Sequence, residues 1–475
     1  MLDGDAIEAM RFLDRAVVLP DDGGEALFAR GLLLIGLGME ADAVPFLQSA
    51  IDQVFPSAER LPKRLQLATM MAGGNRYAVF QEFYDGFSSA FCVAVACRSI
   101  RAGEAQGYAF CMDRLCAFLG WLRPAIPQVL RRDEAINGAS YWSQANLGHQ
   151  FWITDDRVAA DAAYGLAKAD AIARGIAPYH FNCGVLVWLP LKTAEALDAD
   201  FVDGAPQVVG DVAWNLPSVA RDWPELVISV GCDRGYFRYF PKLLLSIRRA
   251  HEASGSQSRF LVHCHVADAS DEQIRFFSEI GALIETSYPH MRLVFSHGAP
   301  AHRERSYYTC LRFLTLPTLL QTYDCGVLVL DIDCILHEDF FANIRQSFEY
   351  KFGMRKYNFD DEDHQMGGEP WSITAYPLYI SNTLIGRRLA SFIVRYIEAA
   401  YDPGLVTNWT IDQSALGQAH RMIAQADPEK SILNLARSKP LVRFPHEFGS
   451  KDAFLVSGGI TTLEAVLESF RPLAP

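Results

Sequence analysis

Two acidic residues at the end of an apolar run are the strongest chemical signal in the sequence. The stretch from Gly326 to Phe340 reads GVLVLDIDCILHEDF, and Asp331 and Asp333 follow its four consecutive apolar residues. The run predicts a buried parallel strand, on which side chains two apart point the same way. Two adjacent carboxylates repel each other, and a divalent cation with oxygen ligands, Mg²⁺ or Mn²⁺, removes the repulsion. The alternative is an ordinary polar strand end.

The elements that must position these acids begin near Leu226, where strand-like and helix-like segments alternate. Such alternation is typical of parallel strands joined by crossover helices, and folds of this kind bind ligands at the carboxyl edge of the sheet. We therefore expect an α/β domain with both acids at that edge. The predicted strands are 226–230, 259–266 and 282–285, and the predicted helices are 240–252, 271–280 and 303–322, the last interrupted at Pro317.

The N-terminal part has a different, helical character. Small and apolar residues recur at a spacing of 34, which resembles a tetratricopeptide repeat and implies a protein partner; a plain helical hairpin is the alternative. We expect a repeat-like region over 1–56, a mostly helical region over 57–222, to which we assign no role, and the α/β domain over 223–475. The recurring residues are Ala9, Leu13 and Ala16, which return as Ala43, Leu47 and Ala50.

Composition limits the partners and the compartment. The 475-residue chain has a net charge of −13, which argues against nucleic acid or an anionic membrane as its partner. It begins without a basic, apolar leader, and its apolar runs are shorter than the ~18 residues of a transmembrane segment. Its ten cysteines include no CxxC pair, so we expect buried thiols, and a cytoplasmic protein without a transmembrane segment.

Three segments in order resemble a known family. The run SYYTCLRFLTLPTLLQTYDCGVLVLDIDCILHEDF from Ser306 is similar to the Tyr-rich helix, arginine and Asp-x-Asp strand of GT-A glycosyltransferases, in particular the glycogenin and lipopolysaccharide galactosyltransferase group. ISVGCDRGYFRYFPKLLLSI resembles the first strand, turn and helix of that family, and WTIDQSAL from Trp409 resembles its Asp-Gln segment. The resemblance covers roughly residues 224 to 450. It implies a GT-A-like nucleotide-diphospho-sugar transferase domain behind the helical region.

The activity that this resemblance implies is metal-dependent transfer of a sugar from a nucleotide-sugar donor, with a UDP-sugar the leading candidate, to a hydroxyl of a glycan or protein acceptor. A diphosphate leaving group develops negative charge, which a bound metal stabilises. By resemblance, Asp331 and Asp333 would hold Mn²⁺ or Mg²⁺ against the diphosphate. Asp233 and Tyr236, in the turn after the first strand, would contact the base or the ribose.

The resemblance also implies roles for five further residues. Arg312 would approach the nucleotide or its phosphates, and Asp412 with Gln413 would face the transferred sugar or the acceptor. His446 would be a third metal ligand and Lys451 a phosphate contact. Here the late segment has one residue fewer before the lysine than the family pattern His-x-x-Gly-x-x-Lys-Pro-Trp, and it lacks the Pro-Trp. The Asn-Ala/Ser-Gly segment of the family is also missing.

Two rival interpretations use the same residues. A strand ending in Asp-x-Asp is also similar to the first motif of haloacid-dehalogenase-type phosphatases, with Asp331 as nucleophile, but no Gly-Asp pair follows it. The other rival is a non-catalytic scaffold or nucleotide-sugar-binding protein with a tetratricopeptide interaction module. His263 and His265 lie on one face of a predicted strand, and structural histidines are favoured there over metal ligands.

Overall fold

The computed structural model describes the α/β part of the chain and a helical pair that precedes it. The described residues are 139–176, 183–204, 212–356, 370–371, 373–426, 432–435, 441–443, 451 and 463–471, with single positions at 30, 42, 46, 131 and 134. The repeat-like region predicted over 1–56, apart from three single positions, and most of the middle region up to residue 138 lie outside them. No described helix has both the length and the apolar character that crossing a membrane would need.

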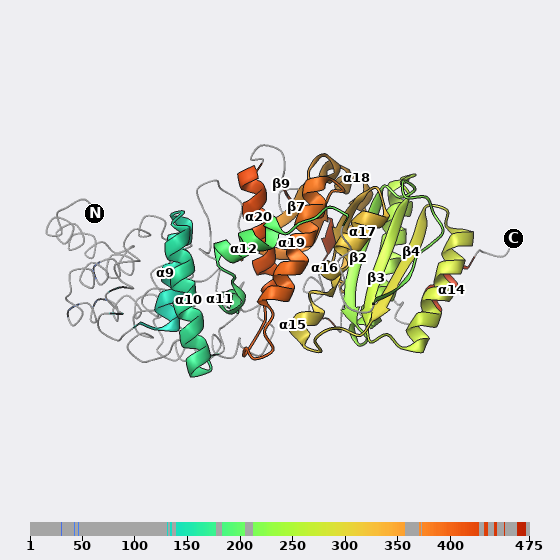
Figure 1. Ribbon diagram of the computed structural model, residues 1–475. Helices are drawn as coiled ribbons and strands as arrows, with labels where there is room; N and C mark the ends of the chain where they lie inside the picture. The colour runs from blue at the N-terminus through green and yellow to red at the C-terminus, as the bar shows by residue number, and fades with distance from the viewer. Residues whose placement is uncertain are drawn as a thin grey trace. The chain divides into compact units, whose positions relative to one another are not determined.

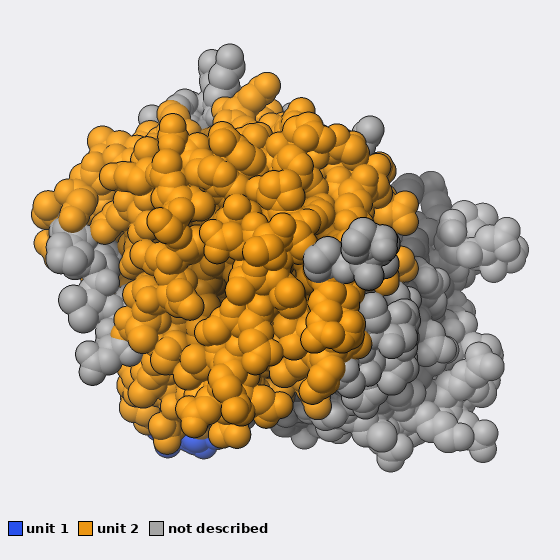
Figure 2. Space-filling view, turned by 90° about the vertical axis from the view of Figure 1, so that its right-hand side faces the viewer, with its two compact units in different colours: residues 1–186, 358–370 blue, residues 187–357, 371–475 orange. Residues whose placement is uncertain are grey.

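The chain divides into two compact units, which Figure 2 shows in different colours. The first comprises Met1–Leu186 and Asn358–Pro370, and the second Val187–Tyr357 and Trp371–Pro475. We expected the α/β domain to begin at residue 223, but the compact unit that holds the sheet begins at Val187. The residues between these two boundaries supply an edge strand and a helix, both of which are too short to give a clear periodic signal.

The longest described elements of the first unit are two packed helices, α9 (Tyr141–Ile153) and α10 (Arg157–Arg174). Ser140 forms a capping box at the start of α9, and the Asp156 side chain caps α10. Capping residues of this kind satisfy the amide donors that a helix leaves open at its start.

The second unit is built on a mixed sheet, which has eight strands among the described residues, in the order β1-β4-β3-β2-β5-β8-β7-β9. Its centre is four parallel strands, β4, β3, β2 and β5, of which β2, β3 and β4 are labelled in Figure 1. Antiparallel pairs join β1 to β4, β5 to β8 and β8 to β7, and β9 is parallel to β7. The strands are β1 (Val212–Asn215), β2 (Leu226–Asp233), β3 (Phe260–Ala267), β4 (Met291–Gly298), β5 (Gly326–Val329), β7 (Phe352–Lys356), β8 (Ile373–Ile380) and β9 (Ile432–Asn434).

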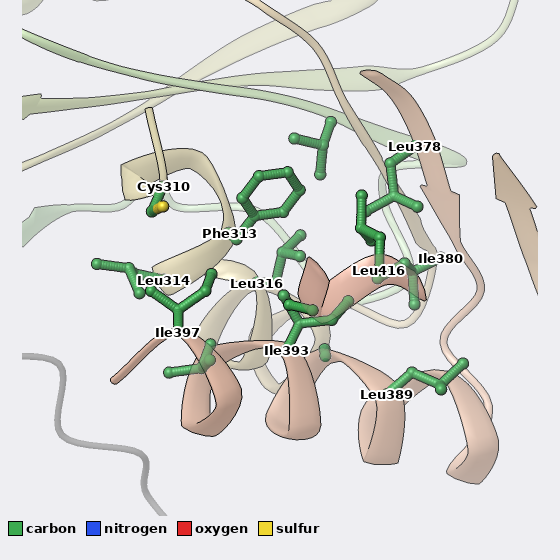
Figure 3. Close-up of a cluster of buried hydrophobic side chains, with 14 of the residues drawn as sticks. Cys310, Phe313, Leu314, Leu316, Leu378, Ile380, Leu389, Ile393, Ile397 and Leu416 are labelled. Atoms are coloured by element: carbon green, nitrogen blue, oxygen red, sulfur yellow. The ribbon is translucent and has the colours of Figure 1, made fainter. Parts of the chain in front are cut away.

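Helices cover both faces of this sheet, because alternate residues of each buried strand feed two separate cores. On β2, Leu226 and Ile228 join one core with α13, α14 and α22, whereas Val227 joins the other with α16, α17, α19 and α20. Figure 3 shows part of this second core, where side chains of α16, α19, α20 and β8 meet. These helices are α13 (Phe240–Ser254), α14 (Asp271–Ser287), α16 (Leu311–Leu314), α17 (Leu316–Thr322), α19 (Leu384–Ala400), α20 (Ile411–Ala426) and α22 (Leu463–Phe470).

Two sequence predictions within this unit are corrected. Residues 282–285 are not a strand but the last part of α14, in which Ile280 and Ile284 are buried one turn apart, and the next strand is β4. The helix predicted over 303–322 is three short helices, α15 (Arg305–Tyr308), α16 and α17. A short apolar run fits a strand and a buried helix equally well, which explains the first error. Pro317, in the first turn of α17, explains one of the breaks.

Candidate active site

The predicted residues gather at the carboxyl edge of β2 and β5. These strands are adjacent and parallel, so their carboxyl ends lie at the same edge of the sheet. Asp233 is the last residue of β2, and Asp331 and Asp333 follow β5 closely. The strand and its acids, predicted from the sequence, are therefore in the expected place.

Gly231 on β2 sets how closely α16 approaches this edge. A Cβ atom at this position would lie 2.4 Å from the backbone nitrogen of Arg312. Only glycine therefore permits this contact between strand and helix. The close approach brings Arg312 beside the end of β5.

Arg312 joins two acids from different parts of the chain. Its Nη1 donates to the Asp331 carboxylate, and its Nη2 donates to Asp412 Oδ2 at 3.2 Å. The arginine side chain is only 7% exposed, and its Nε has no hydrogen-bond partner within the described part of the chain. Asp412 lies in the first turn of α20. The guanidinium thus holds the end of β5 and the start of α20 in one site.

Lys451 and Tyr236 complete the other side of the site. The Lys451 ammonium donates to Asp333, whose side chain is 8% exposed, and it lies 3.5 Å from the Tyr236 hydroxyl and 4.9 Å from the centre of its ring. Asp233 Oδ1 accepts hydrogen bonds from the backbone nitrogens of Gly235, at 2.6 Å, and Tyr236, at 2.9 Å. Asp233 thus fixes the turn that presents Tyr236.

Gln413 links α20 to strand β8 of the same sheet. Its side-chain amide donates to the Ile373 carbonyl on β8 at 2.7 Å, and its backbone nitrogen donates to Asp412 Oδ1 at 2.8 Å. Thr410, just before α20, has a φ of 71°, a value that is strained for a β-branched residue and that recurs at functional sites. Gln413 therefore anchors α20 and orients Asp412.

Burial and charge shape the ionisation of these groups. Burial raises the pKa of Asp331 to about 6, with Arg312 opposing the shift and Asp333 adding to it. Burial also raises the pKa of Asp412, again against the effect of Arg312. For Arg312 and Lys451, burial alone would lower the pKa, but the neighbouring carboxylates reverse this and raise it. Both cations therefore keep their charge at neutral pH.

The described carboxylates of the site have the chemistry, though not an assembled arrangement, that a hard divalent cation needs. The carboxylates of Asp331, Asp333 and Asp412 face the two cations Arg312 and Lys451, so one net negative charge is left over (three minus two). Carboxylate oxygens are the ligands that Mg²⁺ and Mn²⁺ prefer. Among the described residues no group of three or more histidines, cysteines and acids is arranged to hold a metal. The predicted third ligand, His446, lies outside the described residues.

Sequence reasoning missed three residues that shape the site. Gly231 could have been found, because a glycine inside a strand pattern signals a close backbone approach. Tyr376 places its ring centre 5.7 Å from the Arg312 guanidinium, and the thiol of Cys334 donates to the Asp331 carbonyl at 2.9 Å. Nothing in the spacing of either residue pointed to these contacts.

His263 and His265 are structural, as the sequence favoured. His263 Nδ1 lies 2.9 Å from the Ser229 hydroxyl, and the Ser296 hydroxyl lies 2.9 Å from both His263 Nε2 and His265 Nδ1. The network is buried in the sheet. Burial lowers the pKa of His265 to about 4, with His297 adding to the shift, and lowers that of His263 well below its usual range. Both rings are therefore neutral at pH 7.

Comparisons with protein-family models, with curated proteins and with solved structures found no significant match to this chain.

Proposed function

We propose that this protein is a metal-dependent glycosyltransferase of GT-A type that moves a sugar from a nucleotide-sugar donor to an acceptor hydroxyl. The observation that carries the proposal is a set of linked contacts at the carboxyl edge of the sheet. All eight sequence-predicted site residues within the described part of the chain take part in it. They are Asp233, Tyr236, Arg312, Asp331, Asp333, Asp412, Gln413 and Lys451.

The chemistry of this edge suits a donor whose leaving group is a diphosphate. A divalent cation, when bound to Asp331 and Asp333, stabilises the negative charge that develops on that leaving group. Arg312 holds Asp331 in place and keeps a positive charge inside the site. Lys451, half exposed beside Asp333, supplies a second positive charge on the solvent side. Phosphate oxygens are natural partners for both cations.

The acceptor side of the site is formed by the start of α20. Asp412 is buried and is oriented by Arg312 and by the backbone nitrogen of Gln413. A buried carboxyl group in a fixed position can orient a sugar hydroxyl by hydrogen bonding to it. We assign to Asp412 this positioning of the transferred sugar or of the acceptor hydroxyl.

The test is isothermal titration of UDP and GDP, with and without Mn²⁺, on wild type, Asp331→Asn and Asp339→Asn. We expect metal-dependent binding of one nucleotide that Asp331→Asn abolishes. Asp339→Asn is the matched control, because its side chain is 71% exposed and lies beyond the site. A thermal unfolding curve for each variant checks that it is folded.

Two results would contradict the proposal. One is that neither nucleotide binds under any of these conditions, which would favour the non-catalytic scaffold. The other is release of free phosphate from phosphomonoesters without any nucleotide binding, which would favour the phosphatase. Separately, metal-dependent binding that Asp331→Asn leaves unchanged would contradict only the role of Asp331 in the donor site.

A further inference from the structure

The two carboxylates that follow β5 are each paired with a cation, and the two cations differ in how firmly they are held. The Arg312 side chain is 7% exposed, donates to two carboxylates, and lies close to the rings of Phe313 and Tyr376. The Lys451 side chain is 48% exposed, and Asp333 is its one ionic partner among the residues that the structure describes. Arg312 is therefore a fixed part of the site, and Lys451 is a group that can return to water.

A buried carboxylate needs a compensating charge. The Asp333 side chain is 8% exposed, and an unpaired charge at that depth would be costly. In this structure the ammonium of Lys451 supplies the compensation through Asp333 Oδ2. A divalent cation bound to the same oxygen would repel the ammonium, since both carry positive charge. The two cations therefore exclude each other at Asp333.

We propose that Lys451 is an exchangeable internal counter-ion of Asp333, which a divalent cation displaces when it binds. The inference rests on the metal site of the proposed function. The released ammonium stays at the edge of the site, because the Tyr236 hydroxyl and ring lie next to it. Before the metal binds, Lys451 thereby neutralises the negative charge of Asp333. Because the metal must displace it, Lys451 also weakens metal binding in the absence of a nucleotide.

The displacement has a reciprocal consequence. The metal and the Lys451 ammonium compete for the Asp333 carboxylate. The coupling free energy between them is reciprocal, so if metal binding releases the lysine, removal of the lysine charge must strengthen metal binding. A coupling of ordinary size changes affinity by about tenfold. A lysine with a purely structural role would not have this effect, because its removal would leave metal affinity unchanged or reduce it.

The first experiment is titration of the full chain with MnCl₂ without nucleotide, for wild type, Lys451→Met and Lys192→Met. Lys192→Met removes an exposed positive charge in α12 (Leu191–Ala199) as the matched control. We expect Lys451→Met to bind Mn²⁺ about tenfold more tightly than wild type, with the control unchanged. Equal or weaker binding by Lys451→Met overturns the inference and leaves the metal site intact. Absence of Mn²⁺ binding in both wild type and Lys451→Met overturns the metal site itself.

The second experiment needs no variant and so does not depend on how Lys451→Met folds. Wild type is treated briefly with an amine-reactive reagent, with and without Mn²⁺, and the modification of each lysine is read by mass spectrometry. We expect Mn²⁺ to increase the modification of Lys451 several-fold and to leave Lys192 unchanged. A Lys451 modification rate that Mn²⁺ does not change, at a concentration that saturates the site, overturns the inference.

Discussion

Gly231 shows how one residue without a side chain can set the position of another with a charge. The missing Cβ lets the backbone of α16 lie against β2, and the Arg312 side chain then extends between Asp331 and Asp412. The guanidinium is buried and its charge is shared by two acids, so a shift of the helix would uncouple a buried ion network. Breaking such a network by moving one partner costs more than its net contribution to stability.

Gly231→Ala is therefore expected to destabilise the protein and to weaken nucleotide binding. The added methyl group would meet backbone rather than a flexible side chain, so we expect a loss of about 2 kcal/mol in the free energy of unfolding. Gly281→Ala is the control, because its Cβ meets nothing within 4 Å and it lies inside α14. Alanine there should be neutral or slightly stabilising. Urea unfolding measures both; equal stability of wild type and Gly231→Ala would contradict the prediction.

Among the elements, three of the four central parallel strands were predictable from the sequence, whereas β4 and several of the connections were not. Strands β2, β3 and β5 and helix α13 follow from apolar runs and helical periodicity near their observed bounds. Tertiary packing decides that residues 282–285 are helical and that 303–322 form three helices. Short apolar runs in the sequence do not encode this packing. Asp331 and Asp333 could be placed at the edge because β5 is a fully buried apolar strand that ends just before them. The pairing of Arg312 with Asp412 could not, because it joins residues 100 positions apart.

The histidines of β3 give the sheet a pH dependence of known sign. The pKa of His265 is about 4 in the folded chain against 6.5 for an unperturbed histidine. Between these values the unfolded chain binds more protons, so His265 contributes stability that is fully present above pH 6.5 and is lost as pH falls towards 4. The raised pKa of Asp331 has the opposite effect over part of this range. There the folded chain binds more protons at Asp331 than the unfolded chain does, so this residue makes the free energy of unfolding larger as the pH falls. A comparison of two variants is therefore needed to isolate the histidine.

His265→Gln removes this titration and leaves Asp331 in place. At pH 7 the variant should be less stable than wild type, because it disturbs the hydrogen bond to Ser296. As the pH falls from 7 to 4.5, the difference in the free energy of unfolding should shift by about 2 kcal/mol in favour of the variant. Urea unfolding at several pH values measures the shift. A difference that stays constant with pH would show that His265 is not buried in its neutral form.

On the scale of the whole molecule, the α/β unit includes more of the chain than its strand–helix pattern suggests. β1 pairs with β4, and its Trp214 stacks on His263 with 5.3 Å between ring centres. α12 is fastened to α19 by a salt bridge between Arg388 and Asp198 and a hydrogen bond from Arg395 to Leu197. Residues before 223 therefore stabilise the sheet directly.

Two fragments test this boundary. The fragment 183–475 contains every described strand and both cores of the sheet, and we expect it to unfold cooperatively. The fragment 223–475 lacks β1 and α12, which leaves the edge of β4 and one side of α19 uncovered. We expect it to unfold at a lower temperature or to aggregate. Circular dichroism melts and gel filtration compare them, and equal melting temperatures would contradict the role assigned to residues 183–222.

The two acids that pair with Arg312 lie at very different distances from it along the chain, and this affects the order in which the site forms. During synthesis at roughly 5–20 residues per second, about 5–20 s pass between Arg312 and Asp412, which are 100 residues apart. Asp331, only 19 residues after Arg312, is available long before α20. The parallel strands β2 to β5 and the ion pair of Arg312 with Asp331 can thus form on the ribosome, while the pairing of Arg312 with Asp412 must wait for α20. A nascent chain that ends before residue 411 contains Asp331 and Asp333 but lacks Asp412, so the ion network of Arg312 is still incomplete.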